Sequence, residues 1–216
     1  MQEMTRSKIK LAFLLLVAFV PITLATFAFR NAGEGGFLSG TVNKGFLINP
    51  PADITDLDMR TADGSPIFKS FEEIIALLES DDDYEAQPWH IVYVNTQDCE
   101  ETCRERVHLL RQMHITLNKN TPRVRRYYLH AATEDLTDPT AQHFRAEFPS
   151  MGVAFGNAGI IQNNLSAKGL NLQLADDNYI FFVDPVGNVM MYYTSEHSIA
   201  DIKADLEKLL RHSSLG

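Results

Sequence analysis

The sequence is short of cysteine and of basic residues. Its 216 residues include 2 cysteines, and 19 Lys and Arg stand against 28 Asp and Glu, which gives a formal net charge of −9. A chain this acidic is repelled by phosphate backbones, so we predict no nucleic-acid partner. Two cysteines allow at most one disulfide within the chain.

Several enzyme motifs are also missing. The sequence has no nucleophile elbow, no zincin motif and no P-loop, so nothing in it supports a hydrolase or a kinase. The glycines of residues 152–159 (GVAFGNAG) lack the strand–GxGxxG–helix frame of a nucleotide-binding site. No internal repeat is visible.

What the sequence does contain, first, is an uncharged apolar run at residues 11–29. As a helix, its 19 residues reach about 28 Å, close to the hydrocarbon thickness of about 30 Å. Basic residues in the segment 1–10 favour a cytoplasmic N-terminus, with the rest of the chain outside. We therefore predict a transmembrane anchor at 11–29; a cleavable signal peptide is the alternative.

The remainder of the chain divides into a linker and one domain. Residues 30–46 are rich in glycine and polar residues, which is typical of a flexible tether. Residues 47–213 have the length of a single folded domain.

The domain alternates strand-like and helix-like patterns. The turn Ala62–Gly64 predicts an N-terminal hairpin, and Ser70 is a candidate N-cap for the helix that follows. Later predicted elements are strand 89–96, helix 100–118, strand 123–132, helix 139–148, strands 178–185 and 188–194, and a final helix over 199–210. Residues 151–174 give no clear pattern. This order predicts an α/β fold with a mixed sheet flanked by helices.

Cys99 and Cys103 lie where the strand 89–96 meets the helix 100–118. This is where a thioredoxin-like fold keeps its redox or metal-binding pair, although the spacing is Cys-x3-Cys and not the Cys-x2-Cys of ordinary thioredoxins. A disulfide that closes so short a loop removes little conformational entropy from the unfolded chain. The pair therefore indicates a chemical role more than a structural one. In an exported chain a disulfide is the default state, and a helical i, i+4 pair lies just within its range.

With these elements in place, the chain resembles the Sco family, membrane-anchored thioredoxin-fold proteins that help to load copper into cytochrome c oxidase subunit II. The resemblance covers about residues 47–212 and is carried by LDMRTADGSPI, WHIVYVNTQDCEETC, and YIFFVDPVGNVMMYY with the helix after it. It implies a thioredoxin-like fold and a bacterial inner-membrane protein whose C-terminal domain lies in the periplasm. The implied partner is oxidase subunit II or another assembly factor.

Two departures from the family pattern fall on its metal site. In that family, two cysteines and one histidine hold copper, and the histidine precedes the strand that corresponds to residues 179–184. This chain has Ala175–Asn178 at that place, with no histidine, and Arg104 where the family usually has proline.

The copper site implied by the resemblance therefore has an open third position. Its ligands are Cys99 and Cys103 with either His130, at the end of a predicted strand, or Asp177 as the third. A carboxylate is a hard oxygen ligand that stabilises Cu(I) poorly, so a substitution of Asp for His weakens copper binding.

Thiol chemistry survives the loss of the histidine. Cys103 falls in the first turn of its helix, where the helix dipole favours a thiolate, although nearby acidic residues oppose this. We predict thiol–disulfide exchange by Cys99 and Cys103 that keeps the copper-ligand cysteines of a partner reduced, as in a thiol–disulfide oxidoreductase. Two alternatives stay open: a Cu(I) metallochaperone with an atypical third ligand, and a non-catalytic assembly factor that uses the fold as a docking surface.

Overall fold

The computed structural model describes residues 2–33, 43–80, 87–132 and 138–213. The chain divides into two compact units, Met1–Val42 and Asn43–Gly216, and each is described by itself. Most of the predicted tether, residues 34–42, lies outside the described residues, so the tether stays a prediction.

The first unit contains the helix α1 (Gln2–Gly33). Among the residues that the structure describes, no helix is long and apolar enough to cross a membrane. This finding contradicts the predicted single-pass inner-membrane location with a periplasmic C-terminal domain, and it leaves the predicted anchor at 11–29 unconfirmed. That prediction rested on the length of the run and on its absence of charge. The helix itself is continuous, with Pro21 inside it and the hydroxyls of Thr23 and Thr26 bonded to carbonyl oxygens of the preceding turn.

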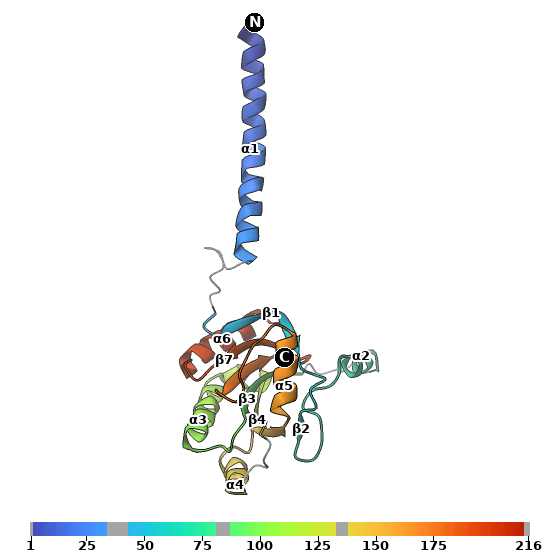
Figure 1. Cartoon of the computed structure of the whole chain (residues 1–216), viewed down its shortest axis with the longest axis vertical. Helices are drawn as coiled ribbons and strands as arrows, with labels where there is room; N and C mark the ends of the chain where they lie inside the picture. Colours follow the sequence, from blue (N-terminus) through green and yellow to red (C-terminus); the bar gives the residue numbers. More distant parts are fainter. Residues whose placement is uncertain (1, 34–42, 81–86, 133–137, 214–216) are drawn as a thin grey trace. The chain divides into compact units, whose positions relative to one another are not determined.

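Within the described residues, the second unit is built on a seven-stranded mixed sheet in the order β1-β7-β6-β3-β4-β5-β2 (Figure 1). The strands are β1 (Phe46–Asp53), β2 (Arg60–Thr61), β3 (Trp89–Asn95), β4 (Val124–His130), β5 (Gly152–Phe155), β6 (Tyr179–Val183) and β7 (Asn188–Tyr193). The helices are α2 (Phe71–Ser80), α3 (Glu101–Ile115), the 3-10 helix η1 (Asn118–Arg123), α4 (Asp138–Glu147), α5 (Ala158–Ala167) and α6 (Ile199–His212). Strands β3, β4 and β5 are parallel, and β6 joins β3 antiparallel.

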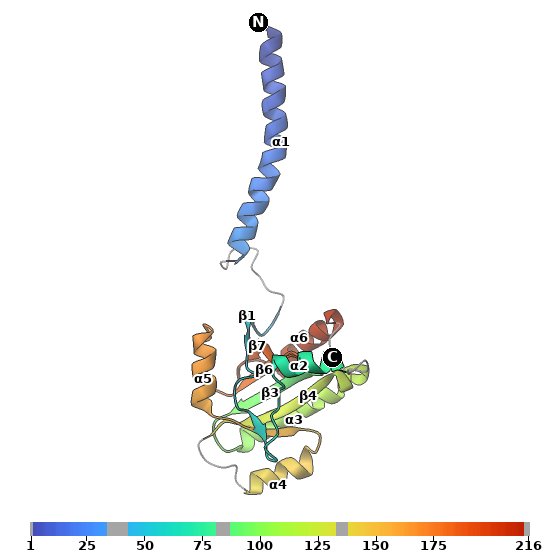
Figure 2. The same ribbon diagram turned by 90° about the vertical axis from the view of Figure 1, so that its right-hand side faces the viewer.

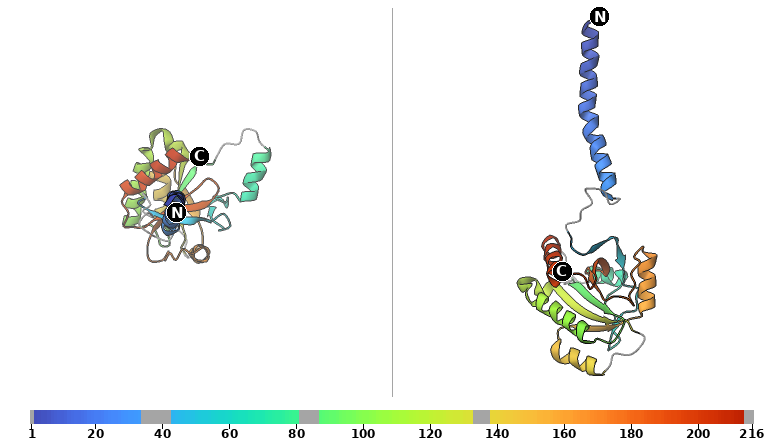
Figure 3. Two further views of the ribbon diagram at one scale, coloured as in Figure 1. Left: turned by 90° about the horizontal axis from the view of Figure 1, so that it is seen from above. Right: turned by 60° about the vertical axis from the view of Figure 1, so that its left-hand side comes forward.

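The centre of the sheet is buried on both faces, which is why β3 and β6 are apolar along nearly their whole length. Helices α3 and α6 cover one face and α5 lies on the other, as Figures 2 and 3 show. The apolar stripe of the predicted helix 100–118 is buried: Val107, Leu110 and Met113 lie on α3, and Leu117 follows just after its end. Truncating a buried leucine of this kind to alanine costs about 2–5 kcal/mol.

Most of the predicted elements are confirmed, and the differences lie in the N-terminal hairpin and in residues 151–174. The turn at Ala62–Gly64 exists, with Gly64 at a φ of 84°, but its strand is only the two-residue β2, which pairs with β5. Residues 151–174 contain β5 and α5, which the sequence did not reveal. A four-residue strand carries too little periodicity to be recognised, and α5 begins at Asn157, whose side chain caps the amide of Ile160.

Asp205 of α6 fixes the beginning of the second unit. Its buried carboxylate accepts hydrogen bonds from the amide of Lys44 (2.7 Å), the amide of Gly45 (2.9 Å) and the hydroxyl of Tyr193 (3.1 Å). A Cβ atom at Gly45 would lie 2.3 Å from the Tyr193 ring, so only glycine fits this close approach. The folded unit therefore includes residues that precede the predicted boundary at residue 47.

We expect Asp205→Ala to lower the free energy of unfolding by about 3 kcal/mol, because it leaves three donors without their buried acceptor. Urea unfolding followed by the fluorescence of Trp89, the single tryptophan, measures this. Glu207→Ala is the control, since Glu207 makes only a partly exposed ion pair with Lys203 and should contribute less than about 1 kcal/mol. Equal losses in the two variants would contradict the role given to Asp205.

His90, in β3, is buried as a neutral ring. It is 5% exposed, and its ring lies 5.1 Å from that of Phe68 and 5.7 Å from that of Tyr127. Burial, with a smaller effect from the charge of Arg125, lowers the pKa of His90 to about 4. The protonated ring is therefore much less stable in the folded chain than in water.

This burial predicts a loss of stability in acid. The unfolded chain, with a histidine pKa of about 6.5, binds the proton first, so the stabilisation is complete above that pH. It falls by on the order of 3 kcal/mol as the pH drops from about 6.5 to about 4. His90→Phe should lack this fall, and unfolding of both chains across that pH range tests it; parallel curves for the two would contradict the prediction.

Candidate thiol–disulfide site

The candidate site lies where the parallel strands end. In the register of the sheet, Asn95 of β3 is opposite His130 of β4, and His130 is opposite Phe155 of β5. The chain leaves Asn95 through a short loop and enters α3 at Glu101, so the cysteine pair lies next to this edge. In an open α/β sheet, the carboxyl ends of the strands are where functional side chains converge.

Cys99 and Cys103 are joined by a disulfide, with their Cα atoms 5.2 Å apart. The pair is buried, with Cys99 0% and Cys103 5% exposed, and both pack in the core cluster between the sheet and α3. The expectation that this spacing can close a disulfide is confirmed. Because the sulfur atoms are covered, a reagent or a partner reaches them only after a local opening of the structure.

Asn95 is the polar side chain that contacts the disulfide. Its amide Nδ2 lies 3.5 Å from Cys103 Sγ and also donates to the Tyr128 hydroxyl at 3.1 Å. Its Oδ1 accepts from the amide of Gln97 at 3.3 Å, which fixes which end of the amide faces the sulfur. Asn95 was not among the residues predicted from the sequence, although a polar residue that ends an otherwise apolar strand is the signal that could have indicated it.

Tyr128 places a neutral phenol beside this amide. Its ring is fully buried and packs on Phe144 of α4, with centroids 4.5 Å apart. Burial raises the pKa of Tyr128 far above its ordinary value, and the hydrogen bond from Asn95 only partly offsets this. The hydroxyl therefore stays protonated and serves as a fixed partner of Asn95.

A second group of polar contacts ties α4 to the cysteine loop. Arg104 donates from Nε to the carbonyl oxygen of Cys99 at 2.9 Å and from Nη2 to the hydroxyl of Thr140 at 3.4 Å. Thr140 in turn donates to Asp98 Oδ2 at 3.2 Å. These bonds hold the beginning of α4 against the segment that carries Cys99.

The structure places the two predicted third ligands differently. His130 is buried on the same sheet edge as Asn95, and its ring stacks on Tyr128 with centroids 6.2 Å apart. The carboxylate of Asp177 accepts from the amides of Asn178 (2.7 Å) and Ser195 (3.4 Å). His130 is therefore brought to the cysteine edge, while the carboxylate of Asp177 is bonded to amides of its own loop and of the loop that follows β7.

The donor set does not fit copper in this form of the protein. The sulfur atoms of Cys99 and Cys103 are bonded to each other, so they do not offer two thiolates. In the described part of the chain, no three His, Cys, Asp or Glu side chains gather so that they could hold a metal ion. The chemistry available to this form is therefore that of a disulfide.

Two hollows flank the cysteine helix. One, of about 270 Å³, is lined by Tyr93, Thr102 and Arg106, and burial raises the pKa of Tyr93 to about 12. The other is a groove of about 810 Å³ between α3 and α4, lined by Arg104 and His143 among others. Both lie beside the N-terminal half of α3, and neither is lined by a cysteine.

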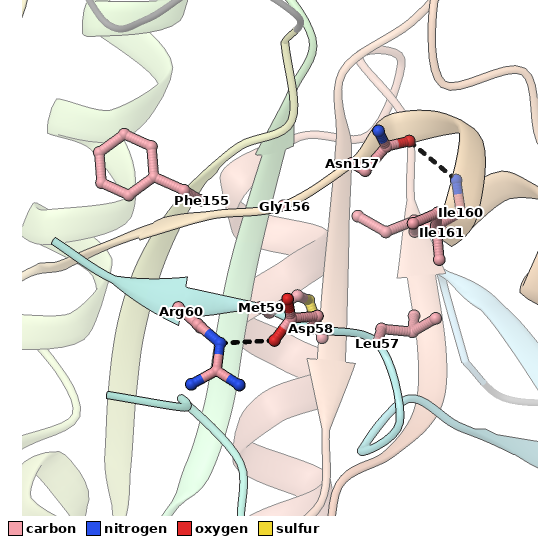
Figure 4. A pocket seen from close by; sticks show the side chains of 9 residues that line it. All are labelled: Leu57, Asp58, Met59, Arg60, Phe155, Gly156, Asn157, Ile160 and Ile161. Carbon is pink, nitrogen blue, oxygen red and sulfur yellow. Dashed lines mark hydrogen bonds and ion pairs between the residues drawn. The ribbon is translucent and has the colours of Figure 1, made fainter. Parts of the chain in front are cut away.

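A third pocket lies elsewhere, between residues 57–60 and 155–161 (Figure 4). Its volume is about 360 Å³, and apolar side chains such as Leu57 and Ile161 line it beside the ion pair of Asp58 with Arg60. No cysteine lines this pocket, so it is not part of the disulfide site.

The parallel strands, the strand–disulfide–helix junction and the closing antiparallel hairpin define a thioredoxin-like protein. The family described as "Transmembrane-like, thioredoxin-like, C-terminal domain" matches residues 89–213, more than half of the chain. The chain belongs to this family. No curated protein matches the sequence.

Solved structures similar to the chain include Sco proteins. BsSco, described as a member of the Sco family of cytochrome c oxidase assembly proteins with a disulfide switch, matches with 14% identity and a TM-score of 0.49, over 79% of this chain and 97% of its own. Copper-bound ScoI of Arabidopsis thaliana matches with 14% identity and a TM-score of 0.45, over 59% of this chain and 87% of its own. A thiol:disulfide interchange protein from Bacteroides sp. matches with 12% identity and a TM-score of 0.45, over 79% and 91%.

Sco proteins are thus among the solved structures to which the chain is similar, in line with the resemblance read from its sequence. Their identities and TM-scores are low, so the assignment of the fold rests on the family match and on the observed sheet.

The contacts of Thr140 predict how easily the disulfide is reached. Thr140→Val removes a hydroxyl that links Arg104 to Asp98, so we expect a dithiol reagent to reduce the disulfide about fivefold faster, the equivalent of one net hydrogen bond. Alkylation of the released thiols, followed by mass spectrometry, measures the rate. Thr121→Val is the matched control, because the Thr121 hydroxyl donates to the carbonyl oxygen of His114, at the other end of α3. Equal reduction rates for the two variants would contradict the prediction.

Proposed function

We propose that this protein carries out thiol–disulfide exchange with a partner protein through Cys99 and Cys103, in the assembly of cytochrome c oxidase. The observation that carries the proposal is the disulfide itself, which closes a five-residue loop between β3 and the beginning of α3. So short a loop contributes little to stability by restraining the unfolded chain. Its position beside a helix N-terminus instead suits a sulfur that must carry negative charge during a reaction.

The exchange moves two electrons. In the reduced protein, one cysteine thiolate attacks a disulfide of the partner, forms a mixed disulfide and releases one partner thiol. The second cysteine then attacks the mixed disulfide, which closes the Cys99–Cys103 bond and releases the other partner thiol. A dithiol reductant must afterwards return two electrons to the pair.

The partner we propose has copper-ligand cysteines, as in oxidase subunit II or another assembly factor. The support is the resemblance of residues 47–212 to the Sco family and the presence of Sco proteins among the structural relatives. Keeping such cysteines reduced requires thiols of this protein and not a bound metal. The proposal therefore does not depend on a third ligand at His130 or Asp177.

This function predicts that each cysteine is needed. Full-length reduced protein should reduce an oxidised cysteine pair in the copper-site domain of subunit II, while Cys99→Ser and Cys103→Ser should each fail to release two partner thiols. Each single variant can go no further than the mixed disulfide, because the second sulfur of the pair is missing. Thiol counts over time, with far-UV circular dichroism to show that the variants stay folded, measure this.

The outcomes separate the alternatives. If the double variant Cys99→Ser/Cys103→Ser supports oxidase assembly as well as the unchanged chain does, the protein is a docking factor and the exchange proposal is wrong. If the reduced chain binds one Cu(I) tightly and does not reduce the partner, the metallochaperone alternative replaces it.

A further inference from the structure

The two cysteines of the pair are not equivalent, and the difference assigns their order of action. Cys99 is completely covered, whereas Cys103 keeps 5% of its surface exposed. We infer that Cys103 is the sulfur that attacks the partner disulfide, that Cys99 resolves the mixed disulfide, and that Asn95 is the residue that positions Cys103. This inference rests on the proposed exchange function and deepens it.

The first support is the hydrogen bond to one sulfur. Asn95 Nδ2 points at Cys103 Sγ from 3.5 Å, and no described side-chain donor is recorded on Cys99 Sγ. The amide is held in place by the amide of Gln97 on its oxygen and by Tyr128 on its other side. Because a hydrogen bond strengthens when its acceptor becomes charged, this fixed donor stabilises a thiolate at Cys103 selectively.

The second support is the position of Cys103 in α3. It is the third residue of the helix, and the N-cap residue, Glu100, makes no side-chain capping bond. The amide groups of the first turn are therefore not neutralised by a cap, and the positive end of the helix dipole acts on a sulfur there. Cys99 lies before the N-cap residue and therefore outside the helix. Acidic residues are near both cysteines in the sequence, so their charge does not distinguish the two.

The reaction consists of two successive thiolate attacks, and each forms one S–S bond and breaks another. The Cys103 thiolate bonds to one sulfur of the partner disulfide, and the partner's own S–S bond breaks, so that its leaving thiolate takes a proton from solvent. The Cys99 thiolate then bonds to Cys103 Sγ and expels the second partner sulfur, which is also protonated by solvent. The product is the disulfide seen in the structure, and a dithiol reductant resets it.

The order of action is tested by trapping. Full-length Cys99→Ser and Cys103→Ser chains are reduced and mixed with dithionitrobenzoate, an aromatic disulfide whose released thiolate is coloured. Cys99→Ser, which keeps Cys103, should form its mixed disulfide about tenfold faster than Cys103→Ser. If Cys103→Ser reacts faster, the inference is overturned while the exchange function stands. If neither folded variant forms a mixed disulfide with this probe or with the oxidised subunit II domain, the proposed function itself fails, and the inference with it.

The role of Asn95 is tested in the Cys99→Ser chain. Asn95→Leu, which removes the donor at similar volume, and Asn95→Asp, which replaces it with a carboxylate, should each slow the reaction about tenfold or more. Asn95→Ser keeps a hydroxyl donor and should recover part of the lost rate, which a purely structural role would not produce. Asp205→Ala is the matched control, because it destabilises the same unit without touching the site, and its rate should stay within about twofold of the parent chain. An Asn95→Leu rate equal to that of the parent, or no recovery with Asn95→Ser, overturns the assignment.

Discussion

The buried amide of Asn95 at the end of β3 constrains the rest of this site. A buried polar group needs hydrogen-bond partners within the protein, and both the backbone and the side chain of Asn95 have them. Its backbone carbonyl accepts from the amide of Ala131 at 2.8 Å, which extends the pairing of β3 with β4, while its side chain contacts the cysteine loop, Cys103 and Tyr128. The strand end, the neighbouring strand and the cysteine helix are therefore fixed relative to one another by one side chain.

The burial of the disulfide sets the conditions for exchange. Both cysteines pack in the core, and Arg104 and Thr140 hold α4 against the loop that carries Cys99. The reactivity of the pair therefore depends on two separable quantities. One is how often the structure around the cysteines opens locally, and the other is how well Cys103 carries a negative charge once a partner reaches it. A partner that binds in the groove between α3 and α4 could change the first quantity without altering the second.

The sequence carried most of the fold because its long elements have strong periodicity. The stripe on α3 and the hairpin of β6 and β7 follow from apolar spacing and turn residues, and the cysteine junction follows from the order of strand and helix. The contacts that shape the site do not follow in this way, since Asn95, Tyr128 and Thr140 meet only through tertiary packing. The four-residue β5 was too short to recognise, whereas α5 has the length of α2 and α4 but begins among the glycines of 152–159, where no clear apolar pattern is visible.

The reduction potential of the Cys99–Cys103 pair tests the central claim most directly. Equilibration of the full-length chain with glutathione or dithiothreitol buffers, followed by alkylation of free thiols, measures it. A redox-active pair should lie between about −120 and −270 mV, the range of proteins that exchange disulfides. A potential below about −300 mV is that of a structural disulfide, and it would contradict the account.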